Sequence, residues 1–167
     1  TVTAGTPLGQ VGFSGRTQFP HLHLSVRQNG EVVDPFAPDT TTCGDSSLSL
    51  WAEPISYQPT ALYTLGFSDA VPAYDAIKEG LPEPDIARTD PVVLWGYAFG
   101  SQPGDVMAFS ITGPYGEVFD QEVTLDKQQA QYFRAGGRKA PNGGWPTGRY
   151  TGQITLFRDG KVIDKRV

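Results

Sequence analysis

Turn-forming residues divide this chain into short segments and leave little room for long helices. Glycine occurs 20 times and proline 14 times in 167 residues, and runs of good helix formers are rare outside Thr124 to Arg134. Between the turns, apolar and polar residues alternate in the pattern of half-buried strands. The sequence therefore predicts a mainly β fold, and a hydrophobic content of 38% is enough for a core.

The first region, Thr1 to Pro38, has the pattern of short antiparallel strands. From His21 to Arg27 the apolar residues occupy alternate positions, so a strand there would place the two histidines together on its other face. Asn29-Gly30 follows, a pair that favours the tight turn of a hairpin because both residues tolerate positive φ. We expect this turn to lead into a second strand that stops at Asp34-Pro35.

Two further regions are expected. Residues 39–91 read as a connector with some packed segments, because proline interrupts them repeatedly, and Tyr74 to Glu79 could form a short helix. Residues 92–167 contain about six strand patterns with turns at Pro114-Tyr115-Gly116 and Asp159-Gly160. This spacing predicts an immunoglobulin-like β-sandwich, with Thr124 to Arg134 as a short helix or a crossover.

Charge and hydropathy exclude two classes of partner. The formal net charge is −5, and the lysines and arginines form no basic stripe that could neutralise a phosphate backbone. No apolar run approaches the ~20 residues that a membrane-spanning helix needs. We therefore expect neither nucleic-acid binding nor a membrane span.

His21 and His23 are the strongest candidates for chemistry. Alternate residues of a strand lie roughly 6 to 7 Å apart, so the two imidazoles could share one reacting centre. The alternative is a pair of partly buried histidines that only donate hydrogen bonds. Two other sets are weaker: the acidic residues are expected to be solvated rather than to bind calcium, and the aromatic residues to fill the core rather than line a ligand groove. The acidic set is Asp69, Asp75, Glu79, Glu83 and Asp85, and the aromatic set is Trp95, Trp145, Tyr150 and Phe157.

The first region also resembles a known family. The loop Gly12-Phe13-Ser14-Gly15, the run Pro20-His21-Leu22-His23, the Asn29-Gly30 turn and the Asp34-Pro35 stop follow one another as in the end of the M23 (lysostaphin- or LytM-like) peptidase domain. The resemblance covers about Thr1 to Pro38. It implies a zinc metalloendopeptidase that cuts bacterial cell-wall peptidoglycan peptide and is periplasmic, in the cell envelope or secreted. It also implies that His23 binds zinc and that His21 is the catalytic histidine beside the attacking water.

Two features depart from the family pattern. His21 and His23 are the only histidines, so the family's upstream His-x-x-x-Asp segment, which supplies two zinc ligands, is absent from this sequence. A catalytic zinc normally has three protein ligands, so we expect this chain alone to bind little or no zinc and to be inactive. Phe19 also stands where the family usually has glycine, which changes the expected shape of the substrate groove.

We therefore expect a truncated M23-like sheet from an active parent, joined to the sandwich. Its exposed edge would pair with another chain or with the missing N-terminal part. The alternative is a non-catalytic peptidase-like binding or regulatory module of the cell envelope. Cys43, the only cysteine, is either a buried free thiol or has its partner outside this sequence.

Overall fold

The chain forms two compact units of antiparallel strands. The structure, a computed structural model, describes residues 1–12, 15–16, 22–39, 49–53, 55–56 and 58–167. The first unit is Thr1–Tyr57 and the second is Gln58–Val167. Strands predominate over the single short helix of the described residues, so the predicted mainly β class is confirmed.

The first unit contains a small hairpin. Strand β1 (Val26–Gln28) pairs antiparallel with β2 (Glu31–Val33). Asn29 and Gly30 connect the strands with φ angles of 53° and 90°, which is the left-handed geometry that a two-residue hairpin turn requires. The predicted turn is therefore confirmed.

The prediction of a strand from His21 to Arg27 is wrong for most of the residues in this range that the structure describes. Residues 22–25 precede β1 and belong to no strand. These residues have no partner strand, because β2 ends at Val33. There the Asp34 side chain accepts a hydrogen bond from the Phe36 backbone nitrogen at 2.8 Å and turns the chain. Pro35 has no N–H to extend the ladder.

The start of the predicted connector contacts the end of this hairpin. The rings of Phe36 and Trp51 lie 5.4 Å apart between centroids, and the Leu50 backbone nitrogen donates to the Pro35 carbonyl at 2.9 Å. Apolar side chains elsewhere in the unit, such as Leu22, Leu24 and Val32, are exposed. The described part of the unit thus has aromatic contacts but no buried apolar core.

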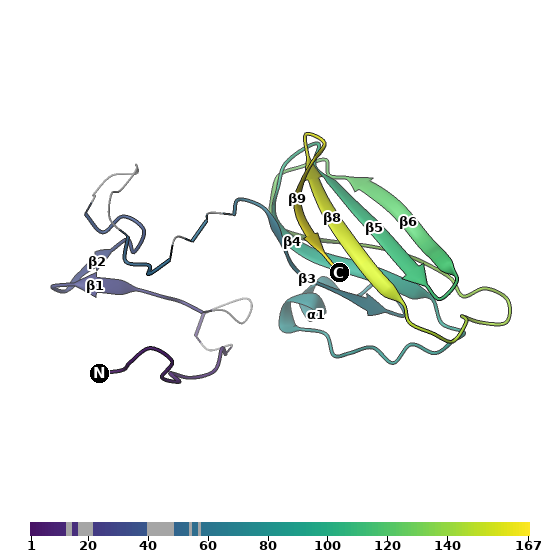
Figure 1. Ribbon diagram of the computed structural model, residues 1–167, viewed down its shortest axis with the longest axis horizontal. Helices are drawn as coiled ribbons and strands as arrows, with labels where there is room; N and C mark the ends of the chain where they lie inside the picture. Colours follow the sequence, from purple (N-terminus) through teal and green to yellow (C-terminus); the bar gives the residue numbers. More distant parts are fainter. Residues whose placement is uncertain (13–14, 17–21, 40–48, 54, 57) are drawn as a thin grey trace. The chain divides into compact units, whose positions relative to one another are not determined.

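The second unit is a two-sheet sandwich (Figure 1). The smaller sheet has the order β3-β4-β7 and the larger sheet the order β6-β5-β8-β9, with every neighbouring pair antiparallel. The chain alternates between the sheets in the Greek-key manner of immunoglobulin-like sandwiches. The strands are β3 (Ala61–Ser68), β4 (Val92–Ser101), β5 (Val106–Gly113), β6 (Gly116–Thr124), β7 (Gln129–Arg138), β8 (Thr151–Arg158) and β9 (Lys161–Arg166).

The main core lies between the two sheets. Leu94 from the smaller sheet packs with Phe109 and Ile154 from the larger one, and all three are fully buried. Gly96 shows how closely the sheets approach, since a Cβ atom there would lie 2.5 Å from Cδ1 of Ile154. Alternation of large apolar residues along each strand therefore produces one interdigitated layer.

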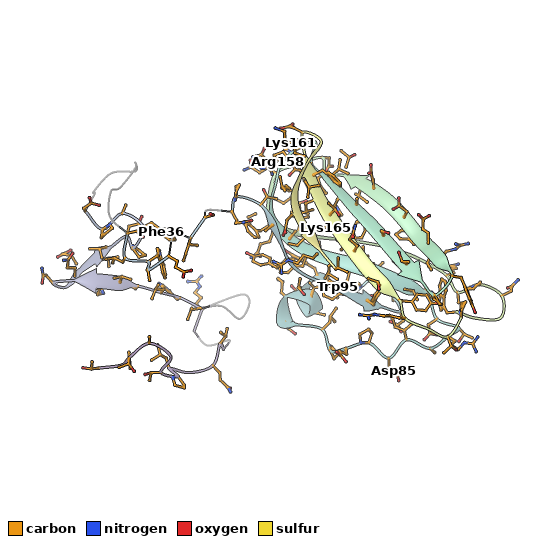
Figure 2. All side chains as sticks on the ribbon, viewed as in Figure 1. Phe36, Asp85, Trp95, Arg158, Lys161 and Lys165 are labelled. Atoms are coloured by element: carbon orange, nitrogen blue, oxygen red, sulfur yellow. The ribbon has the colours of Figure 1, made fainter. Side chains whose placement is uncertain are left out.

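A second, smaller core covers the outer face of β4. Helix α1 (Tyr74–Glu79) places Ile77 against Trp95 and Tyr97, and Figure 2 shows Trp95 beside this helix. The helix ends at Gly80, which has a φ of 89°. The helix predicted here from sequence is confirmed, and it shields one face of the sheet from water.

A tyrosine corner precedes β8. The Tyr150 hydroxyl donates to the Pro146 carbonyl at 2.9 Å, and the Trp145 ring meets the Tyr150 ring edge-on at 6.1 Å. A tyrosine that bonds back to the backbone just before this strand is a hallmark of immunoglobulin-like sandwiches. The tyrosine corner and the strand order therefore both indicate an immunoglobulin-like sandwich.

Two expectations about this unit differ from the structure. The compact unit begins at Gln58, so β3 and α1, expected in a connector over 39–91, belong to the sandwich unit. Residues 129–138 form strand β7 rather than a helix or crossover, because they pair along β4 from Ser101 to Val92. Tertiary pairing overrides the helix propensity of the glutamines there.

Candidate functional site

The structure describes only one of the two predicted site residues. His21 lies outside the described residues, while His23 is exposed and stands three residues before β1. The hairpin does not extend to His23, so no strand face is formed at that position. The roles assigned to His21 and His23 therefore stay predictions.

No metal centre is formed by the described residues. Nowhere in the described ranges do three histidine, cysteine, aspartate or glutamate side chains come together. A zinc site needs three protein ligands, and His23 alone does not provide them. The described residues thus do not fit a zinc ion by themselves.

The acidic stretch lies on the surface as expected. Asp69, Glu79, Glu83 and Asp85 are exposed, and Asp75 makes an ion pair with Lys78 one helical turn away at 2.6 Å. All five side chains are exposed, which agrees with the solvated interpretation of this stretch.

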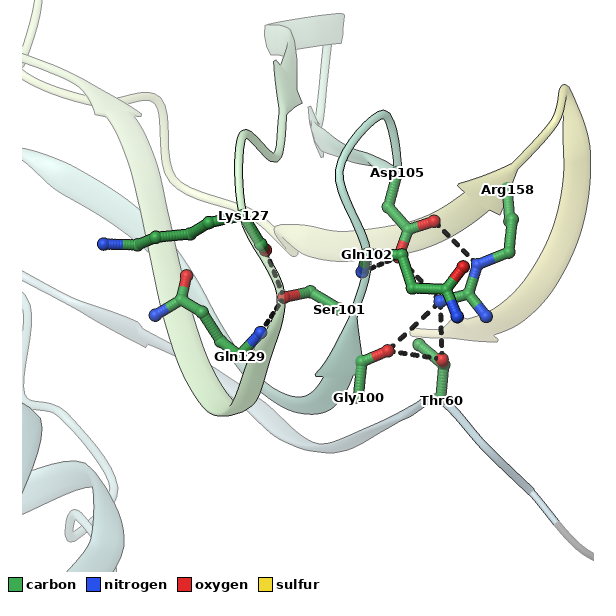
Figure 3. A network of polar contacts seen from close by, with 8 residues as sticks. All are labelled: Thr60, Gly100, Ser101, Gln102, Asp105, Lys127, Gln129 and Arg158. Carbon is green, nitrogen blue, oxygen red and sulfur yellow. Dashed lines mark hydrogen bonds and ion pairs between the residues drawn. The ribbon is translucent and has the colours of Figure 1, made fainter.

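A network of polar contacts in the sandwich is centred on Arg158 (Figure 3). Its guanidinium donates from Nε and Nη2 to the two carboxylate oxygens of Asp105, each at 2.8 Å. Nη2 also donates to the Thr60 hydroxyl at 2.8 Å and to the Gly100 carbonyl at 3.1 Å. We call these four residues the Arg158 network; it joins the start of β3, the end of β4, the approach to β5 and the end of β8.

Burial and hydrogen bonding explain the electrostatics of this network. Asp105 is only 2% exposed, and its carboxylate also accepts the Gln102 backbone nitrogen at 2.8 Å. The hydrogen bonds from Arg158 are the largest cause that lowers the pKa of Asp105. Both carboxylate oxygens accept hydrogen bonds, and these bonds favour the ionised form of the buried side chain.

Ser101 extends the same end of the sandwich. Its hydroxyl donates to the Lys127 carbonyl and accepts from the Gln129 backbone nitrogen, both at 3.0 Å (Figure 3). The side chain is completely buried. It thereby fixes the turn into β7 without exposing a reactive group.

The described sandwich has a groove of about 500 Å³. Phe67, Ile86 and Tyr150 contribute apolar walls, and Arg88 and Asp85 contribute charge. Trp145 also lines the groove although it is only 7% exposed. The full lining is Phe67, Pro84 to Arg88, Val92, Trp145 to Gly148 and Tyr150.

The aromatic residues singled out in the sequence therefore serve two purposes. Trp95 and Trp145 are buried, which confirms the expectation of core packing. Trp145 and Tyr150 additionally line the groove. The groove size is within the range of small-ligand sites.

Comparisons with known proteins identify no relative. No family model matches the chain, no curated protein matches it, and no solved structure matches it. The described residues also contain no helix long and apolar enough to cross a membrane.

Sequence reasoning missed both the Arg158 network and the groove. Arg158 had a usable signal, because it directly precedes the Asp159-Gly160 turn while Asp105 follows the Pro103-Gly104 turn. Nothing in the pattern shows that these two turns lie at the same end of the sandwich. The groove depends on residues 84–88 running beside residues 145–148, which local patterns do not reveal.

Proposed function

We propose that Thr1 to Pro38 is the C-terminal part of an M23-like zinc metalloendopeptidase domain acting on bacterial cell-wall peptidoglycan peptide. The observation that carries this proposal is the order of the motifs: Pro20-His21-Leu22-His23 is followed at the family's spacing by the Asn29-Gly30 turn and Asp34-Pro35. The hairpin at Asn29 and Gly30 has the left-handed turn geometry that this spacing requires. An exposed His23 is accessible to a metal ion that other ligands hold.

Activity in this proposal requires groups from outside these 167 residues. His23 would provide one zinc ligand and His21 would act beside the attacking water, as the resemblance implies. The other two protein ligands would come from a His-x-x-x-Asp segment, which this sequence does not contain. The chain alone is then inactive, and the sandwich would position or regulate the catalytic domain.

The decisive test uses the full gene product that contains this chain. If it carries an upstream His-x-x-x-Asp segment, we expect zinc binding and hydrolysis of purified peptidoglycan. His23→Ala should then lose zinc, whereas His21→Ala should keep zinc and lose rate. Ser25→Ala, an exposed position two residues after His23, is the control and should leave both unchanged.

Two results would contradict this proposal. A gene product without such a segment would favour the non-catalytic binding or regulatory module. Unchanged turnover in both histidine variants would show that the assigned roles are wrong.

A further inference from the structure

Both asparagines of this chain are followed by glycine. The pairs are Asn29-Gly30 and Asn142-Gly143, and both asparagines are exposed. In such a pair the glycine nitrogen can attack the side-chain amide carbon of asparagine, because glycine has no Cβ to hinder the approach. Each pair therefore has the chemistry for deamidation, and the surrounding structure decides which of the two reacts.

Deamidation needs no reactant other than water and changes no oxidation state. The glycine nitrogen bonds to Cγ of asparagine, its proton passes through solvent to Nδ2, and the Cγ–Nδ2 bond breaks. Ammonia leaves and a five-membered succinimide ring remains. Water then opens the ring at one of its two carbonyls. Opening at Cγ gives aspartate, and opening at the backbone carbonyl gives isoaspartate, in which the chain runs through the side chain.

The hairpin turn holds Asn29 away from ring closure. Closure requires the Cβ atom of asparagine and the nitrogen of the next residue to lie on the same side of the Cα–C bond. Asn29 has a φ of 53°, and in this left-handed region, where ψ is about +47°, the next nitrogen lies almost opposite Cβ. The side chain of Asn29 can therefore react only after the turn opens.

Little in the hairpin opposes this opening. Strands β1 and β2 have three residues each, and no side chain of either strand is buried. A lone two-stranded hairpin is marginally stable in water. The bond across the turn from Nη1 of Arg27 to the Gly30 carbonyl, 2.9 Å long, is exposed as well. We therefore expect the turn at Asn29 to open at a small cost in free energy.

The turn at Asn142 is tied to the core of the sandwich instead. The Gly144 nitrogen donates to the Pro141 carbonyl at 2.9 Å and closes the turn. The next residue, Trp145, is buried and makes two bonds of 2.8 Å with Arg88, one from its own nitrogen and one to its own carbonyl. Opening this turn strains contacts of the folded sandwich, so it costs much more free energy.

We propose that Asn29 is a deamidation site of this protein, gated by the opening of its hairpin, and that Asn142 is protected. The aspartate product keeps the turn, because Asp-Gly suits the same geometry. The isoaspartate product does not, because its extra backbone carbon breaks the two-residue spacing. Deamidation thus opens the hairpin irreversibly and adds a negative charge two residues before Glu31. This inference does not depend on the proposed peptidase function.

The test incubates the full chain in neutral buffer and follows each asparagine by peptide mapping and mass spectrometry. Enzymatic methylation of isoaspartate identifies that product. Two unstructured reference peptides, covering residues 26–33 and 139–146, give the rates without a folded turn. We expect Asn29 to react within about tenfold of its peptide, and Asn142 to be slower than its peptide by about a hundredfold or more.

A variant tests whether the anchored turn protects Asn142. Arg88→Ala removes the side-chain bonds to the Trp145 and Gly143 carbonyls, which are 2.8 and 3.5 Å long. It should raise the rate at Asn142 about two- to tenfold, as expected for the loss of hydrogen bonds, and leave the rate at Asn29 unchanged. Arg149→Ala, at an exposed position nearby, is the matched control and should change neither rate.

Urea gives the same comparison without a mutation. Asn142 should accelerate only as the sandwich begins to unfold, whereas Asn29 should already react near the rate of its peptide. The proposal is overturned if Asn29 is protected as strongly as Asn142, or if position 29 yields no isoaspartate. NMR signals of the hairpin at residues 26–33 should disappear as isoaspartate accumulates, and an intact hairpin in that product would refute the loss of the turn.

Discussion

Arg158 and Asp105 face each other through two parallel hydrogen bonds, Nε to Oδ1 and Nη2 to Oδ2, each 2.8 Å long. The carboxylate side chain is 3% exposed and the guanidinium side chain 20% exposed. Removing one partner of a buried pair leaves the other charge uncompensated. Loss of either partner is therefore expected to destabilise the sandwich.

Asp105→Asn should destabilise the sandwich and change its response to acid. We expect a loss of about 3 kcal/mol at neutral pH, because Arg158 loses its charged partner. The pKa of Asp105 is lowered in the folded protein. Its contribution to the free energy of unfolding is therefore complete above its pKa in the unfolded chain, which is about 4, and is lost as the pH falls through its pKa in the folded protein. Urea unfolding at several pH values should show this loss in the wild type and not in the variant.

The matched control for that experiment is Arg166→Ala. Arg166 lies 3.9 Å from Asp164 and its side chain is 52% exposed. Exposed ion pairs of this kind contribute about 0 to 1 kcal/mol to the free energy of unfolding. A larger effect for Arg166→Ala than for Asp105→Asn would contradict the importance assigned to the Arg158 network.

Tyr150→Phe should lower stability by about 1 kcal/mol, because it removes the hydroxyl that donates to the Pro146 carbonyl at 2.9 Å. Thermal unfolding should show a decrease of several degrees in Tm. Tyr115→Phe is the control, since Tyr115 is 88% exposed in a turn. An unchanged Tm for Tyr150→Phe would mean that water replaces the lost bond at no cost.

Gly137→Ala should destabilise the sandwich more than Gly96→Ala. A Cβ atom at Gly137 would lie 2.2 Å from the backbone oxygen of Val92, whereas at Gly96 the nearest atoms are side-chain ends of Ile154 and Met107. Side-chain ends can move, so we expect Gly96→Ala to lower the free energy of unfolding by about 1 to 3 kcal/mol. Denaturant midpoints measure the difference, and the reverse order would show that β7 shifts easily against β4.

The chain on its own should retain far less than one zinc ion after dialysis. Among the described residues no three ligating side chains converge, and the sequence has only two histidines. Elemental analysis of the purified protein checks this expectation. Zinc retained near one ion per chain would require ligands that the family resemblance does not identify.

The sequence predicted the features that depend on neighbouring residues. Asn29-Gly30 and Asp159-Gly160 both form the expected turns, with positive φ at all four positions. Met107, Phe109 and Ile111 occupy alternate positions in the sequence, and all three side chains lie in the core. In these segments the local pattern and the packing agree.

The remaining features depend on contacts between distant segments. β3 was expected in a connector because prolines flank it, yet its pairing with β4 makes it part of the sandwich. The glutamines before Gln131 favour a helix, but backbone pairing with β4 decides the structure. Sequence also could not show that Asp105 and Arg158, separated by 53 positions, form an ion pair.

The position of Thr60 has a mechanical consequence. Thr60 stands two residues after Gln58, where the compact unit begins, and its hydroxyl donates to the Gly100 carbonyl at 2.7 Å while accepting from Arg158. Tension applied to the chain ahead of β3 would reach these side-chain bonds before the first backbone bonds between β3 and β4. Loading from that direction therefore has to rupture a charged junction before it can peel a strand away.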